Sequence, residues 1–286
     1  MPGNTQLLLI GAALTASVSG LVHVKMKSGA DAGALTLEEV VVTTPAAVDT
    51  SRLPAAAAVA QQAARAVLDG VGLESGMARA RTSTALAALS PKVRVQSDSD
   101  ALRLAFQAYY NYKAANPRDV KKPYLYYVDY GLDAYTPRGY VFDMESLTVV
   151  DGPFTVAHGR GSAPTSKGIP TRFSNRSGSN STSLGLYLAQ ETYSFSGTSG
   201  GRKYRSVGLR LTGLSGSYNS AARARGVVVH GAPYVTPRRA GRSEGCPAME
   251  QERAQRLIPR IANGGLVFLF SPRDRTWMAQ DRWANL

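Results

Sequence analysis

The chain contains one cysteine, Cys246, among its 286 residues. A single thiol excludes an internal disulfide, and the three histidines, His23, His158 and His230, lack the paired spacing of a zinc site. We therefore expect neither a disulfide scaffold nor a metal centre. A lone thiol can instead act as a nucleophile, provided that a base takes its proton and N–H donors stabilise the developing oxyanion.

Negative charge is scarce in the second half of the chain. Residues 1–150 carry 14 Lys and Arg against 13 Asp and Glu, whereas residues 151–286 carry 19 against 7. The formal net charge of +13 therefore lies almost wholly in the half that contains Cys246. A basic surface attracts nucleic acid, anionic lipid or an anionic cell-wall polymer. Because no helix-turn-helix, zinc-finger or RNP-like pattern is present, nucleic acid is not the expected partner.

Residues 7–24 form an apolar run that resembles the hydrophobic part of a secretory signal. The usual basic start is missing, because Met1 to Gln6 contain no Lys or Arg, and a buried helix is the alternative. Several Ser, Thr and Gly make the run marginal as a permanent membrane span. We interpret residues 1–27 as an export segment that can associate with the membrane, and expect the protein in the periplasm or cell envelope.

The next segment, residues 28–95, is rich in Ala, Gly, Thr and Pro without a sustained period, which is typical of a linker. Within it, the alanine content of Ala55 to Leu68 favours a helix. The folded body is predicted to span residues 96–286. Its first helix begins after the capping cluster Ser97 to Asp100 and ends at Asn116-Pro117.

From Tyr124 onward the composition is typical of strands, with β-branched and aromatic runs separated by Gly-, Ser- and Pro-rich turns. One amphipathic helix is predicted over Glu250 to Ile261, and it ends at Asn263-Gly264-Gly265. The expected fold class is mostly β (α+β), a sandwich or barrel with a few peripheral helices. The predicted strands are Tyr124 to Tyr130, Gly139 to Met144, Leu147 to Val150, Phe154 to Ala157, Leu184 to Leu188, Val207 to Leu211, Val227 to Val229 and Leu266 to Phe270.

The predicted strand Val227 to Val229 places His230 at its end, and Cys246 follows after a loop that contains Pro233 and Pro237. If that loop folds back, an imidazole nitrogen can take the thiol proton. A thiolate beside an imidazolium has a lowered pKa, which is the usual way to arm a cysteine.

The turn around Cys246 supplies the remaining parts of such a site. Gly245 allows a sharp turn, and Pro247 restricts the backbone, so that the Gly245 and Cys246 N–H groups can converge as an oxyanion hole. Ser243 is a candidate hydrogen-bond donor to the site. Arg242 is a candidate ligand for a substrate carboxylate, with an ordinary solvated charge as the equal alternative.

These residues carry a resemblance. The stretches His230-Gly231-Ala232 and Gly241 to Ala248 resemble the signature of the YkuD-type L,D-transpeptidases, and more narrowly the murein L,D-transpeptidase catalytic domain family. The resemblance extends from about Ala101 to Phe270. Further matching blocks are Val156 to Ser162, Phe173-Ser174-Asn175, Gly178-Ser179, Thr182 to Gly185, Arg210 to Leu214 and Asn219 to Arg225.

The chain departs from the wider superfamily beside the cysteine. An arginine often follows the cysteine there, whereas this chain has Pro247, Ala248 and Met249, a form that fits the narrower family. Glu244 would raise the thiol pKa if its carboxylate pointed inward, so we expect it to point outward.

The resemblance implies a peptidoglycan enzyme without cofactors. Cys246 would attack the L-centre carbonyl of meso-diaminopimelate in a stem tetrapeptide and release D-alanine, and a neighbouring amine would complete a 3→3 cross-link. His230 would act as the base. His158, Gly231, Ser174 and Asn175 would line the substrate cleft with Arg242, although His158 is also an alternative partner for Cys246.

Other readings are weaker. Water as the acceptor would make the protein an L,D-carboxypeptidase. A sortase-like enzyme would carry an arginine on a strand after the cysteine, and papain-like hydrolases place Cys before His. A non-catalytic basic wall-binding protein would usually have lost one of Cys246, His230, Gly245 or Ser243, and all four are present.

Overall fold

The computed structural model describes residues 21–28, 35–43 and 76–285, and the chain divides into two units, residues 1–72 and 73–286. The first unit contains an antiparallel pair of strands, β1 (Leu21–Ser28) and β2 (Leu35–Thr43). These strands occupy parts of the segments interpreted above as export segment and linker. The helix predicted over Ala55 to Leu68 lies outside the described residues.

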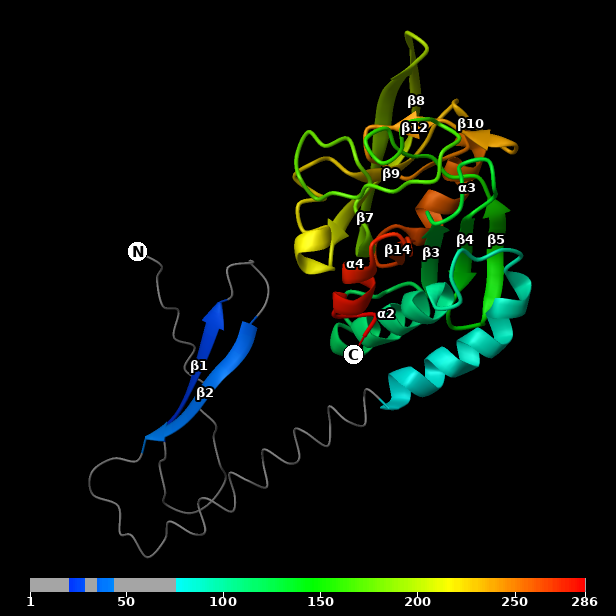
Figure 1. The fold of residues 1–286 in the computed structure, drawn as a ribbon. Coiled ribbons are helices and arrows are strands. Elements are labelled where there is room, and N and C mark those ends of the chain that lie inside the picture. The colour runs from blue at the N-terminus through cyan, green and yellow to red at the C-terminus, as the bar shows by residue number, and fades with distance from the viewer. Residues whose placement is uncertain (1–20, 29–34, 44–75, 286) are drawn as a thin grey trace, which may run out of the picture. The chain divides into compact units, whose positions relative to one another are not determined.

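The second unit is built on an eight-stranded sheet (Figure 1) in the order β13-β9-β8-β7-β14-β3-β4-β5. The pairs β14–β3 and β13–β9 are parallel, and the other neighbours are antiparallel. The strands are β3 (Tyr124–Asp129), β4 (Gly139–Asp143), β5 (Thr148–Phe154), β7 (Gly185–Ser199), β8 (Arg202–Gly213), β9 (Val228–Gly231), β13 (Ala248–Met249) and β14 (Leu266–Phe270). A large sheet with packed helices confirms the predicted α+β fold.

Helices cover both faces of this sheet. Because side chains alternate along a strand, Leu266, Phe268 and Phe270 of β14 lie in one core cluster, and Val267 and Leu269 lie in the other. The first cluster includes α2 (Ala101–Ala115), α4 (Arg275–Gln280) and residues 76–89, a helix continued by the 3-10 turn η2 (Ser90–Lys92). The second includes α3 (Gln251–Ile261). A buried central strand is thus held between two helical layers.

Two predicted helices are confirmed. The helix α2 follows Asp100 and ends at Asn116. The helix α3 buries Ala254, Leu257, Ile258 and Ile261, whose spacing places them on one face of a helix. Beyond α3, Asn263 and Gly264 adopt positive φ angles of 61° and 120°, as expected where a glycine-rich segment ends a helix.

Two strand predictions are corrected. Phe154 is the last residue of β5. Of residues 155–157, the rest of the predicted strand, only Ala157 makes a bridge, to Ala248. Residues 190–206, whose Gly, Ser and Thr content suggests turns, instead belong to a long hairpin of β7 and β8. Figure 1 shows this hairpin extending beyond the rest of the sheet. The compact unit also begins at Leu73, ahead of the predicted residue 96, because Ala85 and Leu89 are buried in its core.

Two short pairs complete the unit near the end of β9. The strands β6 (His158–Gly159) and β12 (Arg242–Ser243) pair in parallel, and β10 (Val235–Thr236) pairs with β11 (Arg239–Ala240) in a small hairpin. A further 3-10 turn, η3, spans Gly216–Tyr218. Among the described helices, none combines the length and apolar character needed to cross a membrane.

Candidate active site

Cys246 lies in the tight turn between β12 and β13. The Ser243 hydroxyl donates to the Cys246 carbonyl at 2.6 Å and accepts from the Gly245 N–H at 3.2 Å, so one side chain holds both ends of the turn. Gly245 has a φ of +127°, and a Cβ on it would lie 3.0 Å from the Ser181 carbonyl oxygen. The turn therefore requires glycine at this position.

His230 lies on β9, directly beside the strand that follows the cysteine turn. In the parallel pair of β9 and β13, His230 is opposite Ala248, and the His230 N–H donates to the Pro247 carbonyl at 3.4 Å. The loop between His230 and Cys246 thus folds back onto the strand end, as the sequence predicts. The turn that holds the thiol and the strand that holds the imidazole are neighbours at one end of the sheet.

The imidazole of His230 is held in one orientation by two contacts. Its Nδ1 lies 3.1 Å from the Gly231 carbonyl oxygen, and the Phe195 ring stacks on it with centroids 4.0 Å apart and an interplanar angle of 17°. A carbonyl can only accept, so Nδ1 carries the proton in the neutral ring. That tautomer leaves Nε2 as the basic nitrogen.

Both groups are electrically neutral at rest near pH 7. Burial raises the pKa of the half-exposed Cys246 thiol to about 11, against the opposing effects of the Val228 N–H and of Arg225. Burial lowers the pKa of His230 to about 4, and its hydrogen bond to Gly231 opposes this only in part. Neither shift favours a thiolate and an imidazolium in the resting site. Proton transfer has to accompany attack.

Arg225 is a cation that lies beside the cysteine turn. Its guanidinium donates to the carbonyls of Ser174 at 2.7 Å and Ser181 at 2.8 Å, and its Nη2 lies 3.6 Å from the Cβ position at Gly245. Its charge lowers the pKa of Cys246, and a thiolate at Cys246 would in turn raise the pKa of Arg225. Arg225 thus joins the loop around Ser174 to Ser181 to the turn that carries the thiol.

With this geometry in place, the chain can be compared with known proteins. The family model described as L,D-transpeptidase catalytic domain matches residues 94–270, more than half of the chain. The chain belongs to the L,D-transpeptidase catalytic domain family. No curated protein sequence matches it.

Solved structures with similarity to this L,D-transpeptidase domain include three enzymes of the same name. One from Mycobacterium smegmatis is 15% identical, with a TM-score of 0.32, and the match covers 52% of this chain and 59% of that one. One from Mycobacterium tuberculosis is 16% identical, with a TM-score of 0.30 over 52% and 58%. One from Stackebrandtia nassauensis is 15% identical, with a TM-score of 0.30 over 68% and 92%. The chain thus spans less than two thirds of the first two structures' length.

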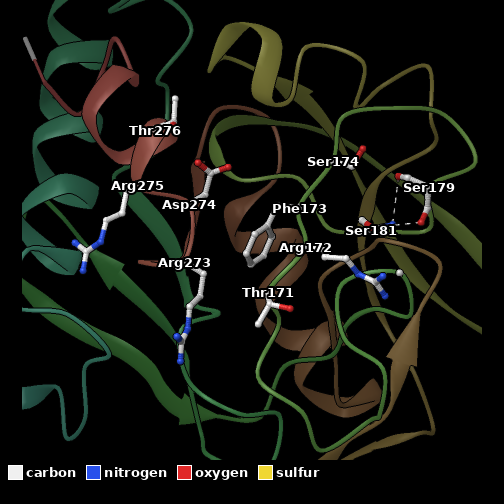
Figure 2. Close-up of a pocket in the computed structure, with 11 residues that line it drawn as sticks. Thr171, Arg172, Phe173, Ser174, Ser179, Ser181, Arg273, Asp274, Arg275 and Thr276 are labelled. Carbon is white, nitrogen blue, oxygen red and sulfur yellow. Dashed lines mark hydrogen bonds between the residues drawn. The ribbon is translucent and has the colours of Figure 1, made fainter.

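Two of the predicted substrate residues lie on accessible surfaces of the L,D-transpeptidase domain. Arg242 is exposed, and its Nη1 donates to the carbonyls of Ala163 at 3.1 Å and Pro164 at 2.9 Å, which leaves other N–H groups for an anion. Ser174 lines a pocket of about 690 Å³ together with Phe173, Ser179 and Ser181 (Figure 2).

The other three predicted substrate residues are committed to internal contacts. His158 is fully buried, and its Nδ1 accepts from Arg138 at 2.9 Å. Gly231 packs against α3, because a Cβ there would lie 2.8 Å from that of Ala254. The Asn175 amide donates to the Ser217 carbonyl and accepts from the Ala221 N–H. Through these contacts the three residues position the surrounding strands and loops.

His158 is unsuited to act as the base for Cys246. Burial, followed by the charges of Arg138 and Arg242, lowers its pKa to about 3. The Arg138 guanidinium is itself fully buried and also donates to the Val156 and Leu132 carbonyls. This buried pair anchors β6, which in turn pairs with β12 beside the cysteine turn.

The structure differs from the predicted oxyanion hole in one of its two N–H donors, that of Gly245. The Gly245 N–H is already used by the Ser243 hydroxyl, so it is not a free donor in this arrangement. The Cys246 N–H, by contrast, has no acceptor among residues 76–285. Cys246 itself is the better candidate donor. Glu244 points outward, as expected, because its carboxylate binds Arg160 at 2.8 Å on an exposed surface.

Several residues near the thiol have no signal in the sequence motif. The Tyr234 ring lies 6.5 Å from the His230 ring between centroids, and Tyr193 and Tyr204 pack on Phe195, which stacks on His230. Tyr193 and Tyr204 come from the β7–β8 hairpin, which the turn-like composition concealed. Arg225, by contrast, lies in one of the matching blocks of the family resemblance, Asn219 to Arg225. In the described parts of the chain, no three His, Cys, Asp or Glu side chains gather as metal ligands.

Proposed function

We propose that this protein is a cysteine acyl-transferase that acts on peptidoglycan stem peptides, with Cys246 as the nucleophile and His230 as the base. The observation that carries the proposal is the position of the cysteine turn beside the strand of His230, in a chain of the L,D-transpeptidase family. The free Nε2 of His230 and the unbonded Cys246 N–H supply the two further functions that thiol chemistry needs.

In the first half-reaction, the Cys246 sulfur attacks the L-centre carbonyl of the donor diaminopimelate residue while its proton moves to His230 Nε2. The Cys246 N–H stabilises the oxyanion. The carbon–nitrogen bond to the terminal D-alanine then breaks, and His230 returns its proton to the leaving amine. A thioester and free D-alanine are the products.

In the second half-reaction, an amine from another stem peptide attacks the thioester and loses a proton to His230. The sulfur leaves and recovers that proton, and the new amide is the 3→3 cross-link. With water in place of the amine, the same steps release a tripeptide. Two neutral groups suit this sequence, because His230 has to accept and return a proton in each half-reaction.

The proposed substrate agrees with the charge of the chain. The half that contains the site carries a net charge of +12, and the bacterial cell wall is an anionic polymer matrix. We therefore place the protein in the cell envelope, exported through its N-terminal segment and acting in the periplasm.

The test is mass spectrometry of the products formed from disaccharide-tetrapeptides by the full chain and by its Cys246→Ala variant. A dimer lighter than two monomers by one D-alanine, absent with the variant, supports the transpeptidase. A tripeptide without dimer supports the carboxypeptidase instead. Unchanged substrate with the native chain would contradict both.

A further inference from the structure

The pocket beside Ser174 is linked to the cysteine turn through Arg225 and the Ser181 backbone. Three of its lining residues, Ser174, Ser179 and Ser181, accept hydrogen bonds from Arg225. Arg225 in turn lies 3.6 Å from the Cβ position at Gly245, and the Ser181 carbonyl lies 3.0 Å from the same point. One loop therefore forms the wall of the pocket on one side and contacts the turn of Cys246 on the other. A molecule in this pocket would be separated by this one loop from the turn that carries Cys246.

Positive charge dominates the pocket. Arg172 and Arg273 lie on either side of the Phe173 ring, whereas Arg275 is turned away from it (Figure 2) and contacts Asp98 at 3.4 Å. Across residues 76–285, the guanidinium groups of Arg172 and Arg273 have no hydrogen-bond or carboxylate partner. Guanidinium groups without a partner at a concave surface are typical ligands for carboxylates and phosphates.

We propose that this pocket binds carboxylates of the peptide substrate, one at Arg172 and another at Arg273. The proposal rests on the proposed function, because a stem peptide bears free carboxylates close to its cleaved bond. Two features favour a peptide over a phosphate polymer. The Phe173 ring offers an apolar surface, and the Asp274 carboxylate, which caps α4, adds a negative charge that would repel a polyanion. The volume of about 690 Å³ also suits a short peptide segment.

The test measures binding without chemistry, by calorimetry on full-length Cys246→Ala protein. The probes are a stem tetrapeptide with free carboxylates and the same peptide with those carboxylates converted to amides. We expect the double substitution Arg172→Gln and Arg273→Gln to weaken binding of the free-carboxylate peptide about 10- to 100-fold, the range for lost charged hydrogen bonds. The amidated peptide should bind the native pocket and the altered pocket equally weakly.

A matched control removes two charges elsewhere, by Arg79→Gln and Arg118→Gln, both on exposed surface. If this control weakened binding equally, net charge alone would explain the effect, and the proposal would be overturned. Unchanged peptide binding in the Arg172 and Arg273 variant would also overturn it. Binding of a polyphosphate chain in place of the peptide would overturn the choice of ligand. Because the assay needs no turnover, intact binding with no reaction in the native enzyme would contradict the proposed function and leave the pocket assignment in place.

Discussion

At the scale of single residues, the reactivity of Cys246 is set by opposing neighbours. Burial raises its thiol pKa to about 11, while the Val228 N–H and Arg225 act in the other direction. Arg225 also ties the Ser174 and Ser181 carbonyls together, so its charge is fixed in place beside the turn. Arg225 thus lowers the thiol pKa although it lies outside the cysteine motif.

Replacing Arg225 should therefore slow the reaction of the Cys246 thiol with an electrophile. We expect Arg225→Gln to lower the rate of Cys246 alkylation by iodoacetamide about tenfold at pH 8, which corresponds to a rise of about one unit in its pKa. In the native protein the rate should climb steadily between pH 7 and 9, because the thiol pKa lies above that range. A plateau below pH 8 would contradict the neutral resting state, and Arg225→Lys, which keeps the charge, serves as the control.

At the scale of elements, the β7–β8 hairpin reaches over the end of β9. Its residue Phe195 stacks on His230, and Tyr193 and Phe195 pack edge to face with centroids 6.3 Å apart. Because burial is what lowers the pKa of His230, the hairpin sets the basicity of the proposed catalytic base. The β7–β8 hairpin lies far from His230 and Cys246 in the sequence, but in the folded protein it affects the pKa of His230.

Removing the Phe195 ring should raise the pKa of His230. In Phe195→Ala we expect that pKa to rise from about 4 toward the ordinary value near 6.5, because water replaces the ring. Titration of the His230 imidazole by NMR, with the resonance assigned from a His230→Gln spectrum, measures the shift. Phe195→Leu keeps an apolar cover and should shift it less. An unchanged pKa in the alanine variant would show that other groups exclude water.

The sequence predicts which helices and strands this protein contains better than it predicts how long they are. The apolar spacing of α3 and the glycine at position 245 each have a local physical cause, and both predictions agree with the structure. The extension of β7 and β8 is hidden instead by composition, because its Gly, Ser and Thr residues, such as Ser196 paired with Arg205, are also typical of turns. The contact of Asn175 with the Ala221 N–H joins residues 46 positions apart, so it is invisible before the loops are placed.

At the scale of the whole molecule, two buried neutral histidines make stability depend on pH. Folding lowers the pKa of His158 to about 3 and that of His230 to about 4. The unfolded chain then binds more protons than the folded one once the pH falls below about 6.5. The free energy of unfolding therefore decreases with falling pH, by about 1.4 kcal/mol per pH unit for each histidine.

His158→Asn tests this dependence. Asparagine can still accept from Arg138, but it does not titrate, so the slope between pH 6.5 and 5 should fall by about 1.4 kcal/mol per pH unit relative to the native protein. Urea unfolding at four pH values in that interval measures it. His23→Asn, on β1 of the other unit, controls for the loss of a histidine alone. Equal slopes in the native and His158→Asn proteins would show that His158 titrates alike in both states.

The central claim, that Cys246 forms a thioester with the help of His230, is tested most directly by intact-protein mass spectrometry. The protein is incubated with a disaccharide-tetrapeptide without an acceptor, quenched in acid and digested to locate the adduct. The account predicts a mass increase equal to the substrate minus D-alanine, located at Cys246. The adduct should be absent in Cys246→Ala and should form about 10²- to 10⁴-fold more slowly in His230→Gln, the usual contribution of a general base. An adduct at another residue, or an unchanged rate in His230→Gln, would contradict it.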